Sequence, residues 1–94
     1  VGSTYNFAAP LYRRIIAAFE RCDVAEARRW QSLSAAMVRI IIGNGGRGGL
    51  KAAMALVGAD CGTSRLPTVT CTPAQRVKMK QELTELGFFD WTRP

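Results

Sequence analysis

The glycine-rich segment Gly43–Gly49 lies between two helical patterns and constrains the fold more than any other feature of the sequence. Its spacing, Gly-x-Gly-x-x-Gly, also occurs in the phosphate-binding turn of dinucleotide-binding folds. Such folds need a β-strand before the glycines and an acidic residue about 20 positions later, after a second strand. Here the preceding residues continue a helical stripe that begins near Ala25, and Asp60 follows too early. We therefore predict a turn between two helices, with no NAD or ATP site.

Proline and capping signals predict where the first two helices begin. Pro10 is favoured in the first turn of a helix, so the first helix is predicted to start there. Asp23, with Glu26 one turn later, resembles a capping box and predicts a second helix that runs to about Ile42. The tail Ile40–Ile42 is expected to be buried on nearly all sides. The predicted apolar faces contain Leu11, Tyr12, Ile15, Ile16 and Phe19 in the first helix, and Ala27, Trp30, Leu33, Met37 and Ile40 or Ile41 in the second.

A third helix is predicted directly after the glycines, followed by an irregular segment. The helix starts near Gly49 and ends before Gly58, which suits a left-handed stop. Residues 60–71 contain Pro67 and the β-branched run Thr68-Val69-Thr70. They are therefore expected to cross the surface as an extended strap.

The fourth helix has the strongest start signal in the chain. Thr72-Pro73-Ala74-Gln75 supplies an N-cap, a first-turn proline and a glutamine that reaches back to the cap. The helix is predicted to end at Gly87, with Lys78 and Glu82 one turn apart. Its inward residues are predicted to be Val77, Leu83 and Leu86, and the aromatic tail Phe88, Phe89 and Trp91 is expected to be docked or to lie at an interface.

Charge and cysteine content narrow the classes of function. The chain carries 13 basic and 7 acidic residues, a net charge of +6, but these charges are interleaved as on solvated helix faces. We therefore expect no nucleic-acid binding. Three cysteines and no histidine favour neither a disulfide framework nor a zinc site, so the cysteines Cys22, Cys61 and Cys71 are expected to be reduced. No membrane span or signal peptide is indicated, which predicts a cytoplasmic protein.

The length of 94 residues suits one small domain or a piece of a larger one. The chain begins with Val1 rather than Met, and its first residues have no capping or tail-like composition. We therefore expect a fragment, mainly α-helical as given.

Several motifs occur in an order that resembles a known enzyme family. Gly2-Ser3-Thr4-Tyr5-Asn6 precedes an amphipathic helix, a glycine-containing helical hairpin follows, and Arg65-Leu66-Pro67 precedes the Thr-Pro-x-Gln helix start. Together with the run LKAAMALVG and the closing hydrophobic tail, this set resembles the C-terminal third of the N-acetylneuraminate lyase and dihydrodipicolinate synthase family. The ordered set covers nearly all 94 residues and is specific to the superfamily, not to one enzyme within it.

The resemblance implies a fold and an assembly. Residues 1–22 would be the end of a TIM (β/α)8 barrel: Val1–Asn6 the end of the eighth strand and its loop, and residues near Phe7 to Arg21 the eighth helix. Residues 23–94 would form a C-terminal helical extension. Members of the family commonly act as homotetramers, and a piece without the other barrel strands would leave a large apolar face uncovered.

The resemblance also implies a class I aldolase reaction without a cofactor or metal. In this family a lysine of the sixth strand forms a Schiff base with pyruvate or another 2-keto acid, so that a C–C bond is cleaved or formed. That lysine would precede this chain, and Lys51, Lys78 and Lys80 do not match its position, so the fragment alone is expected to be inactive. The Gly-Ser-Thr-Tyr-Asn motif favours a lyase acting on a sugar acid over dihydrodipicolinate synthase.

Ser3 is the one substrate-binding residue that the resemblance transfers to this sequence. Its position matches the serine that hydrogen-bonds the sugar part of the substrate in sialic-acid lyases. The alternative is that the hydroxyls of Ser3 and Thr4 only satisfy backbone groups where a strand becomes a loop. Gly2 admits two explanations, close approach of a ligand or turn geometry. Arg65 is assigned to the structural strap rather than to the site.

A function of another class also fits the composition. A self-contained basic helical module could bind nucleic acid or a partner helix without catalysis. It should melt as a monomer in one transition, whereas a barrel fragment should be molten or aggregated.

Overall fold

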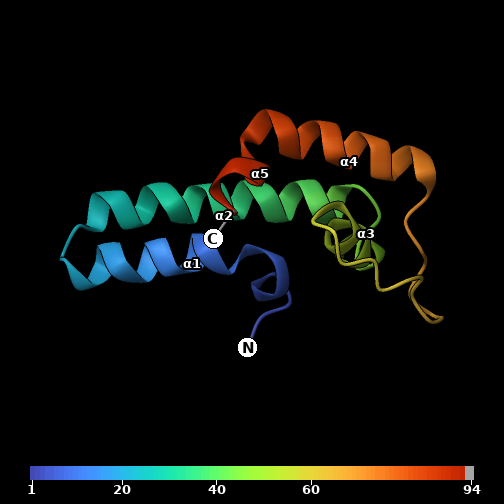
Figure 1. Ribbon diagram of the computed structural model, residues 1–94, viewed down its shortest axis with the longest axis horizontal. Coiled ribbons are helices and arrows are strands. Elements are labelled where there is room, and N and C mark those ends of the chain that lie inside the picture. The colour runs from blue at the N-terminus through green and yellow to red at the C-terminus, as the bar shows by residue number, and fades with distance from the viewer. Residues whose placement is uncertain (93–94) are drawn as a thin grey trace.

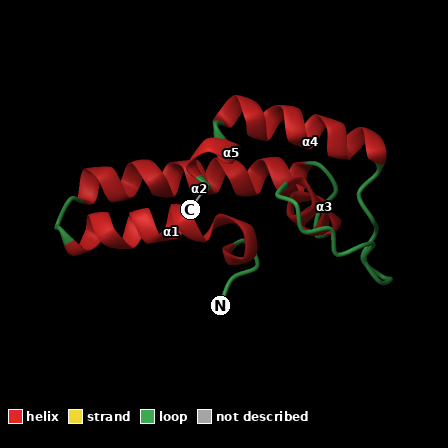
Figure 2. Cartoon of the chain, viewed as in Figure 1, coloured by secondary structure: helices red, strands yellow, loops and turns green. Residues whose placement is uncertain are grey.

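A computed structural model describes residues 1–92 and contains helices but no strand within that range. The last two residues of the expected extension 23–94 lie outside the described residues. Figures 1 and 2 show two long antiparallel helices, a short helix at one end of them and a fourth helix that returns along the second. The helices are α1 (Tyr5–Glu20), α2 (Val24–Gly43), α3 (Gly48–Leu56), α4 (Pro73–Leu86) and α5 (Phe88–Trp91).

One hydrophobic core joins residues from all five of these helices. The core lies where α4 and α5 pack on α2 and where α3 closes one end of the α1–α2 pair (Figure 1). No helix in residues 1–92 combines the length and the apolar character needed to cross a membrane. The largest fully buried side chains are Leu11, Met37, Ile41, Met79, Leu83 and Phe88.

The first helix begins earlier than Pro10 predicted. It starts at Tyr5 and contains a kink at Ala8, whose φ of −125° and ψ of 22° are not helical. Pro10 therefore lies inside α1, just after the kink. A proline has no N–H and its ring clashes with the carbonyl four residues earlier, so it suits the first turn of the straight segment that follows the kink. Pro10 therefore marks the start of the straight segment after the kink, not the start of α1.

Helix α1 is apolar on two neighbouring faces, not on the single packed face that was predicted. Leu11 is fully buried in the core, as is Ala18. Ile16 is 57% exposed, Phe19 is 68% exposed and Tyr5 is 50% exposed. At 100° per residue, Ile16 and Phe19 lie on a face beside the buried one, and Tyr5, which precedes the kink, lines the same groove as Ile16. We call the residues Tyr5, Ala9, Tyr12, Ile16 and Phe19 the open face of α1.

The second helix has the predicted cap and nearly the predicted end. The Asp23 carboxylate accepts a hydrogen bond from the Glu26 backbone N–H at 3.1 Å, and the helix ends at Gly43. The expectation that Ile40–Ile42 are all buried was wrong, because Ile42 is 49% exposed. Ile41 points into the core, and its neighbour one residue later lies 100° away around the helix.

The glycines form the predicted turn between two helices. Gly45 and Gly46 have φ angles of 126° and 60°, which glycine adopts at low cost. No strand precedes them in the described residues, so the dinucleotide-binding alternative has no structural basis.

The third helix begins at Gly48, one residue before the predicted start. Residues 60–71 then cross the surface without helix or strand, as the strap prediction required.

The capping box of α4 is confirmed. The Thr72 hydroxyl accepts from Gln75 N–H at 3.2 Å, and Gln75 accepts from Thr72 N–H at 2.9 Å. The helix ends at Gly87 with a left-handed φ of 88°. Val77, however, was wrongly predicted to point inward and is 69% exposed. The buried stripe is Met79 and Leu83, with Leu86 half-buried.

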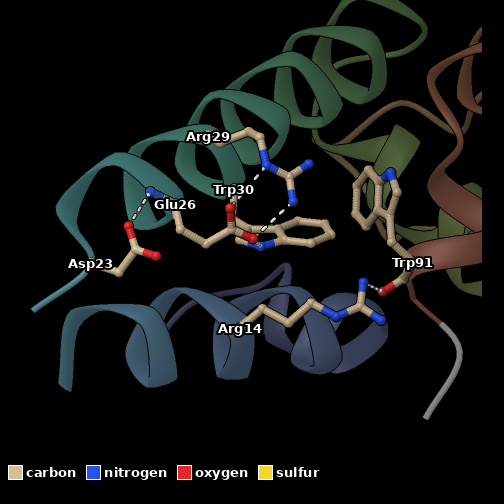
Figure 3. Close-up of polar contacts among 6 residues, drawn as sticks. All are labelled: Arg14, Asp23, Glu26, Arg29, Trp30 and Trp91. Atoms are coloured by element: carbon tan, nitrogen blue, oxygen red, sulfur yellow. Dashed lines mark hydrogen bonds and ion pairs between the residues drawn. The ribbon is translucent and has the colours of Figure 1, made fainter. Parts of the chain in front are cut away.

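The aromatic tail is docked on the hydrophobic core, which was one of the two predicted arrangements. Phe88 and Trp91 are buried in α5, and the Trp91 carbonyl accepts a hydrogen bond from the Arg14 guanidinium at 3.1 Å. Figure 3 shows Trp30 lying between Arg14 of α1 and Arg29 of α2. The two guanidinium carbons lie 4.7 and 4.4 Å from the Trp30 ring centre. The Arg14–Trp30 contact joins α1 to α2, and the hydrogen bond from Arg14 to the Trp91 carbonyl joins α1 to α5.

Glu26 completes this cluster and makes its stability depend on pH. Its carboxylate accepts from Arg29 and from the Trp30 indole N–H, each at 2.8 Å. The Arg29 hydrogen bond, followed by that of Trp30, lowers the pKa of Glu26 below the ordinary glutamate range. A lowered pKa in the folded state contributes stability above the unfolded-state pKa, and this contribution is lost as the pH falls through the lowered pKa.

We therefore expect the wild-type protein to have a higher thermal midpoint than the Glu26→Gln variant, and we expect this advantage to shrink as the pH falls into the acid range. The advantage should be full at neutral pH. Differential scanning fluorimetry over a pH series measures it, with Glu20→Gln as the control, because Glu20 forms no ion pair within residues 1–92. An advantage that stays constant down to pH values below the glutamate range would contradict this role.

Candidate functional site

The segment before α1 is a tight turn whose backbone is fastened to the start of that helix. Tyr5 N–H donates to the Gly2 carbonyl at 3.2 Å, and Ala8 N–H donates to the Thr4 carbonyl at 2.9 Å. The Asn6 side-chain amide donates to the Ser3 carbonyl at 3.0 Å. Tyr5 and Asn6, expected in the loop, therefore already belong to α1. We call residues 2–4 the Ser3 turn.

The two hydroxyls of the Ser3 turn have different surroundings. The Ser3 side chain is exposed, and within residues 1–92 its hydroxyl has no hydrogen-bond partner. The Thr4 hydroxyl is 2.7 Å from the Tyr12 hydroxyl. In the described part of the chain neither hydroxyl bonds a backbone group, which was the alternative role. The Ser3 hydroxyl is thus available to a ligand.

Ser3 lies where three helices approach one another. It lines a groove of about 340 Å³ together with residues of α1 and α3, and a smaller hollow of about 70 Å³ with residues of α2 and α3. Leu50, in the first turn of α3, lines both. The other residues of the larger groove are Asn6, Phe7, Lys51, Met54 and Cys61.

The space beside Gly2 is occupied by this chain itself. A Cβ atom at Gly2 would lie 2.9 Å from the Tyr5 ring. A side chain at this position would therefore displace the outer end of the Tyr5 ring, which is 50% exposed, and would not require the backbone to move.

The lysines and Arg65 occupy positions that fit structural roles. Lys51 donates to the Thr63 carbonyl at 2.9 Å and so ties α3 to the strap. Lys78 and Lys80 are exposed on α4. Arg65 is exposed, and its carbonyl accepts from Thr68 N–H at 3.1 Å in a turn of the strap.

The three cysteines are free thiols, as predicted. Cys22 and Cys61 are exposed, whereas Cys71 is buried and its thiol donates to the Asn44 carbonyl at 3.1 Å. Burial raises the pKa of the Cys71 thiol, and the nearby Arg76 offsets this only in part. A neutral buried thiol of this kind packs rather than reacts. Within residues 1–92 no three His, Cys, Asp or Glu side chains gather as a metal site.

Sequence reasoning missed two residues that connect to the Ser3 turn. Tyr12 was assigned only to an apolar face, and Ser34 was not singled out. Tyr12 is hydrogen-bonded to Thr4, and its hydroxyl is 2.9 Å from that of Ser34 in α2. A signal for Ser34 does exist in the sequence. It lies midway between Ala27 and Ile41 on the buried stripe of α2, where a hydroxyl needs a partner.

Comparisons with known proteins point in one direction. The sequence model of the dihydrodipicolinate synthetase family matches residues 1–86. The chain is 38% identical, over 73 residues, to a protein named N-acetylneuraminate lyase from Lactiplantibacillus plantarum. That match covers 78% of this chain and 25% of the relative, so the chain spans about a quarter of the relative's length.

The fold has a solved counterpart. The structure of Proteus mirabilis N-acetylneuraminate lyase superposes with a TM-score of 0.85 at 34% sequence identity. The superposition covers 94% of this chain and 30% of that protein. The arrangement of these helices therefore matches one part of a larger lyase.

Proposed function

Because this chain belongs to the dihydrodipicolinate synthetase family, we propose that it is part of a pyruvate-dependent Schiff-base lyase that cleaves or forms a C–C bond in a 2-keto sugar acid. The observation that carries the proposal is the close match in fold, over 94% of the chain, to a protein named N-acetylneuraminate lyase. The sequence relative bears the same name. Dihydrodipicolinate synthase is the second candidate, favoured by the family's own description.

In this proposal residues 1–22 are the end of a (β/α)8 barrel and residues 23–94 are a helical extension. The open face of α1 supports this division. A groove of about 580 Å³ runs along it, lined by Tyr5, Ile15 and Ile16 among others. Isolated apolar residues on a surface are ordinary, but a continuous apolar helix face is typical of a surface that packs against protein. The partner proposed for this face is the remainder of the barrel.

The proposed chemistry divides between this chain and the remainder of the enzyme. The lysine that forms the Schiff base with pyruvate would lie outside these residues, and the iminium would accept the electron pair of the cleaved C–C bond. The Ser3 hydroxyl would hydrogen-bond the sugar part of the substrate from the turn before α1, which would follow the last barrel strand at the end of the barrel where such enzymes place their binding groups. The proposal requires no cofactor or metal. The enzyme is further proposed to be a cytoplasmic homotetramer.

A self-contained helical module is the less favoured alternative. Such a module would bury the apolar residues of its own helices, whereas Ile16 and Phe19 are exposed by more than half. A single cooperative melting transition of the isolated 94-residue chain as a monomer would favour the module.

Borohydride trapping on the full-length protein that contains this chain tests the reaction class. Incubation with pyruvate and borohydride should add the mass of a reduced pyruvate adduct at one lysine outside residues 1–94. Aldol cleavage of N-acetylneuraminate and condensation with aspartate semialdehyde then distinguish the two candidate substrates. No adduct with pyruvate would refute the Schiff-base proposal.

The Ser3→Ala variant of the full-length protein tests the proposed binding residue. Loss of one neutral hydrogen bond should raise KM for the sugar acid roughly three- to tenfold, because such bonds contribute about 0.5–1.5 kcal/mol. The rate of pyruvate adduct formation should not change. Ser32→Ala, which removes an exposed hydroxyl on α2, is the matched control. An unchanged KM would remove Ser3 from the site.

A further inference from the structure

A chain of three hydroxyls connects the Ser3 turn to the second helix. The Thr4 and Tyr12 hydroxyl oxygens are 2.7 Å apart, and those of Tyr12 and Ser34 are 2.9 Å apart. Both distances are ideal for O–H···O hydrogen bonds. The chain therefore passes from the turn, across α1, to α2.

The far end of the chain is anchored in the core region. Ser34 is 4% exposed and is one of two buried polar residues in the described part of the chain. A buried hydroxyl without a partner is costly, so the hydrogen bond between Ser34 and Tyr12 is expected to persist. The Tyr12 ring is also held by an edge contact with Tyr5, with ring centres 4.8 Å apart.

The near end of the chain lies next to the residue proposed to bind substrate. Thr4 precedes α1 but its side chain makes no capping hydrogen bond to a backbone N–H of the helix. Its hydroxyl is bonded to Tyr12 instead. Within residues 1–92 this is the one side-chain hydrogen bond that joins the Ser3 turn to a residue beyond the first turn of α1. Thr4 is the residue after Ser3, so the hydrogen bond between Thr4 and Tyr12 also restrains the orientation of Ser3.

We infer that Tyr12 is a positioning residue, which holds the Ser3 turn in its substrate-binding orientation through the hydroxyl chain Thr4–Tyr12–Ser34. The inference rests on the proposed function, because it assumes that Ser3 contacts the sugar part of the substrate. A binding group that is already held in its bound orientation loses less conformational entropy when the ligand binds. Tyr12 touches no reacting atom in this scheme, so its effect falls on binding rather than on the C–C bond step.

The test is the Tyr12→Phe variant of the full-length protein, with Tyr5→Phe as the matched control. Tyr12→Phe removes the hydroxyl and keeps the ring. Tyr5→Phe removes a neighbouring tyrosine hydroxyl that has no hydrogen-bond partner within residues 1–92. We expect Tyr12→Phe to raise KM for the sugar acid roughly three- to tenfold with kcat nearly unchanged. Tyr5→Phe keeps the ring that contacts Tyr12 and should change KM less than Tyr12→Phe does.

Two further variants connect the effect to the hydroxyl chain. Thr4→Val should raise KM as Tyr12→Phe does, and Thr4→Ser should restore the wild-type value, because it keeps the hydroxyl. The Thr4→Val/Tyr12→Phe double variant should be no worse than Tyr12→Phe alone, since Tyr12→Phe already removes the hydrogen bond that Thr4→Val removes. A merely structural role would lower the active fraction, and therefore kcat, without raising KM.

Amide hydrogen exchange separates failure of this inference from failure of the proposed function. In Tyr12→Phe the amides of residues 3–5 should exchange faster than in the wild type and in Tyr5→Phe, whatever reaction the enzyme catalyses. Exchange and KM both equal to the wild-type values would overturn the inference. Faster exchange with no pyruvate adduct in the wild type would instead retain the positioning role and overturn the proposed reaction.

Discussion

Replacement of Gly49 with alanine is expected to destabilise the protein by about 3 kcal/mol, although alanine is the better helix former. Gly49 lies in the first turn of α3, where a Cβ atom would be placed against the backbone carbonyl of Ile41. The same Cβ would lie 3.1 Å from the Met79 methyl carbon. Backbone cannot move aside as a flexible side chain can, so α3 must shift away from α2. Thermal or urea unfolding of the full-length protein measures the loss.

Two other glycines make this experiment specific. Gly48→Ala should be as severe, because its Cβ would meet the Val69 carbonyl of the strap. Gly43→Ala is the matched control, because it lies at the end of α2 with no atom within 4 Å of its Cβ position. That change should leave stability unchanged or raise it by up to about 1 kcal/mol. Equal effects at Gly43 and Gly49 would show that close helix approach is not why α3 begins with glycines.

Ile16→Ser is expected to have opposite effects on the isolated chain and on the full-length protein. In the isolated chain Ile16 is 57% exposed, so serine should cost little stability and should improve solubility. In the full-length protein the open face of α1 is proposed to pack on the barrel. There the change removes a buried apolar side chain and buries a hydroxyl, which together cost about 3–5 kcal/mol. Phe19→Ser should behave in the same way.

Val77→Ser is the control for this second prediction. Val77 is also exposed, on α4, but it lies outside the open face of α1. Its replacement should change the thermal midpoint of the full-length protein less than Ile16→Ser does. Soluble yield of the isolated chain and thermal midpoint of the full-length protein are the two measurements. A full-length Ile16→Ser protein as stable as the wild type would contradict packing of this face against the barrel.

The elements with strong local signals were predicted well. The capping box at Thr72, the Asp23 cap and the stop at Gly87 depend on groups within one turn of chain. The family, too, was recognised from ordered motifs, and the comparisons bear it out over residues 1–86. The start of α1 was misplaced because a favourable Pro10 is compatible both with a new helix and with a segment that follows a kink.

Side-chain environments were predicted less well. Val77 and Ile42 were placed inside because they are apolar and near a stripe, yet both are substantially exposed. Their orientation depends on where α2 and α4 contact each other, and a difference of one residue turns a side chain by 100°. The Thr4–Tyr12–Ser34 chain escaped prediction for a similar reason, since its ends are 30 residues apart in sequence.

By itself, the sequence determined roughly where the four longer helices lie, where two of them are capped and which family the chain resembles, because these features depend on neighbouring residues and on motif order. Only the tertiary structure decided which face of each helix is covered, why Gly48 and Gly49 cannot carry side chains, and which hydroxyls meet beside Ser3. These features depend on contacts between helices. Local periodicity limits such contacts, but only the packed arrangement of all the helices selects among them.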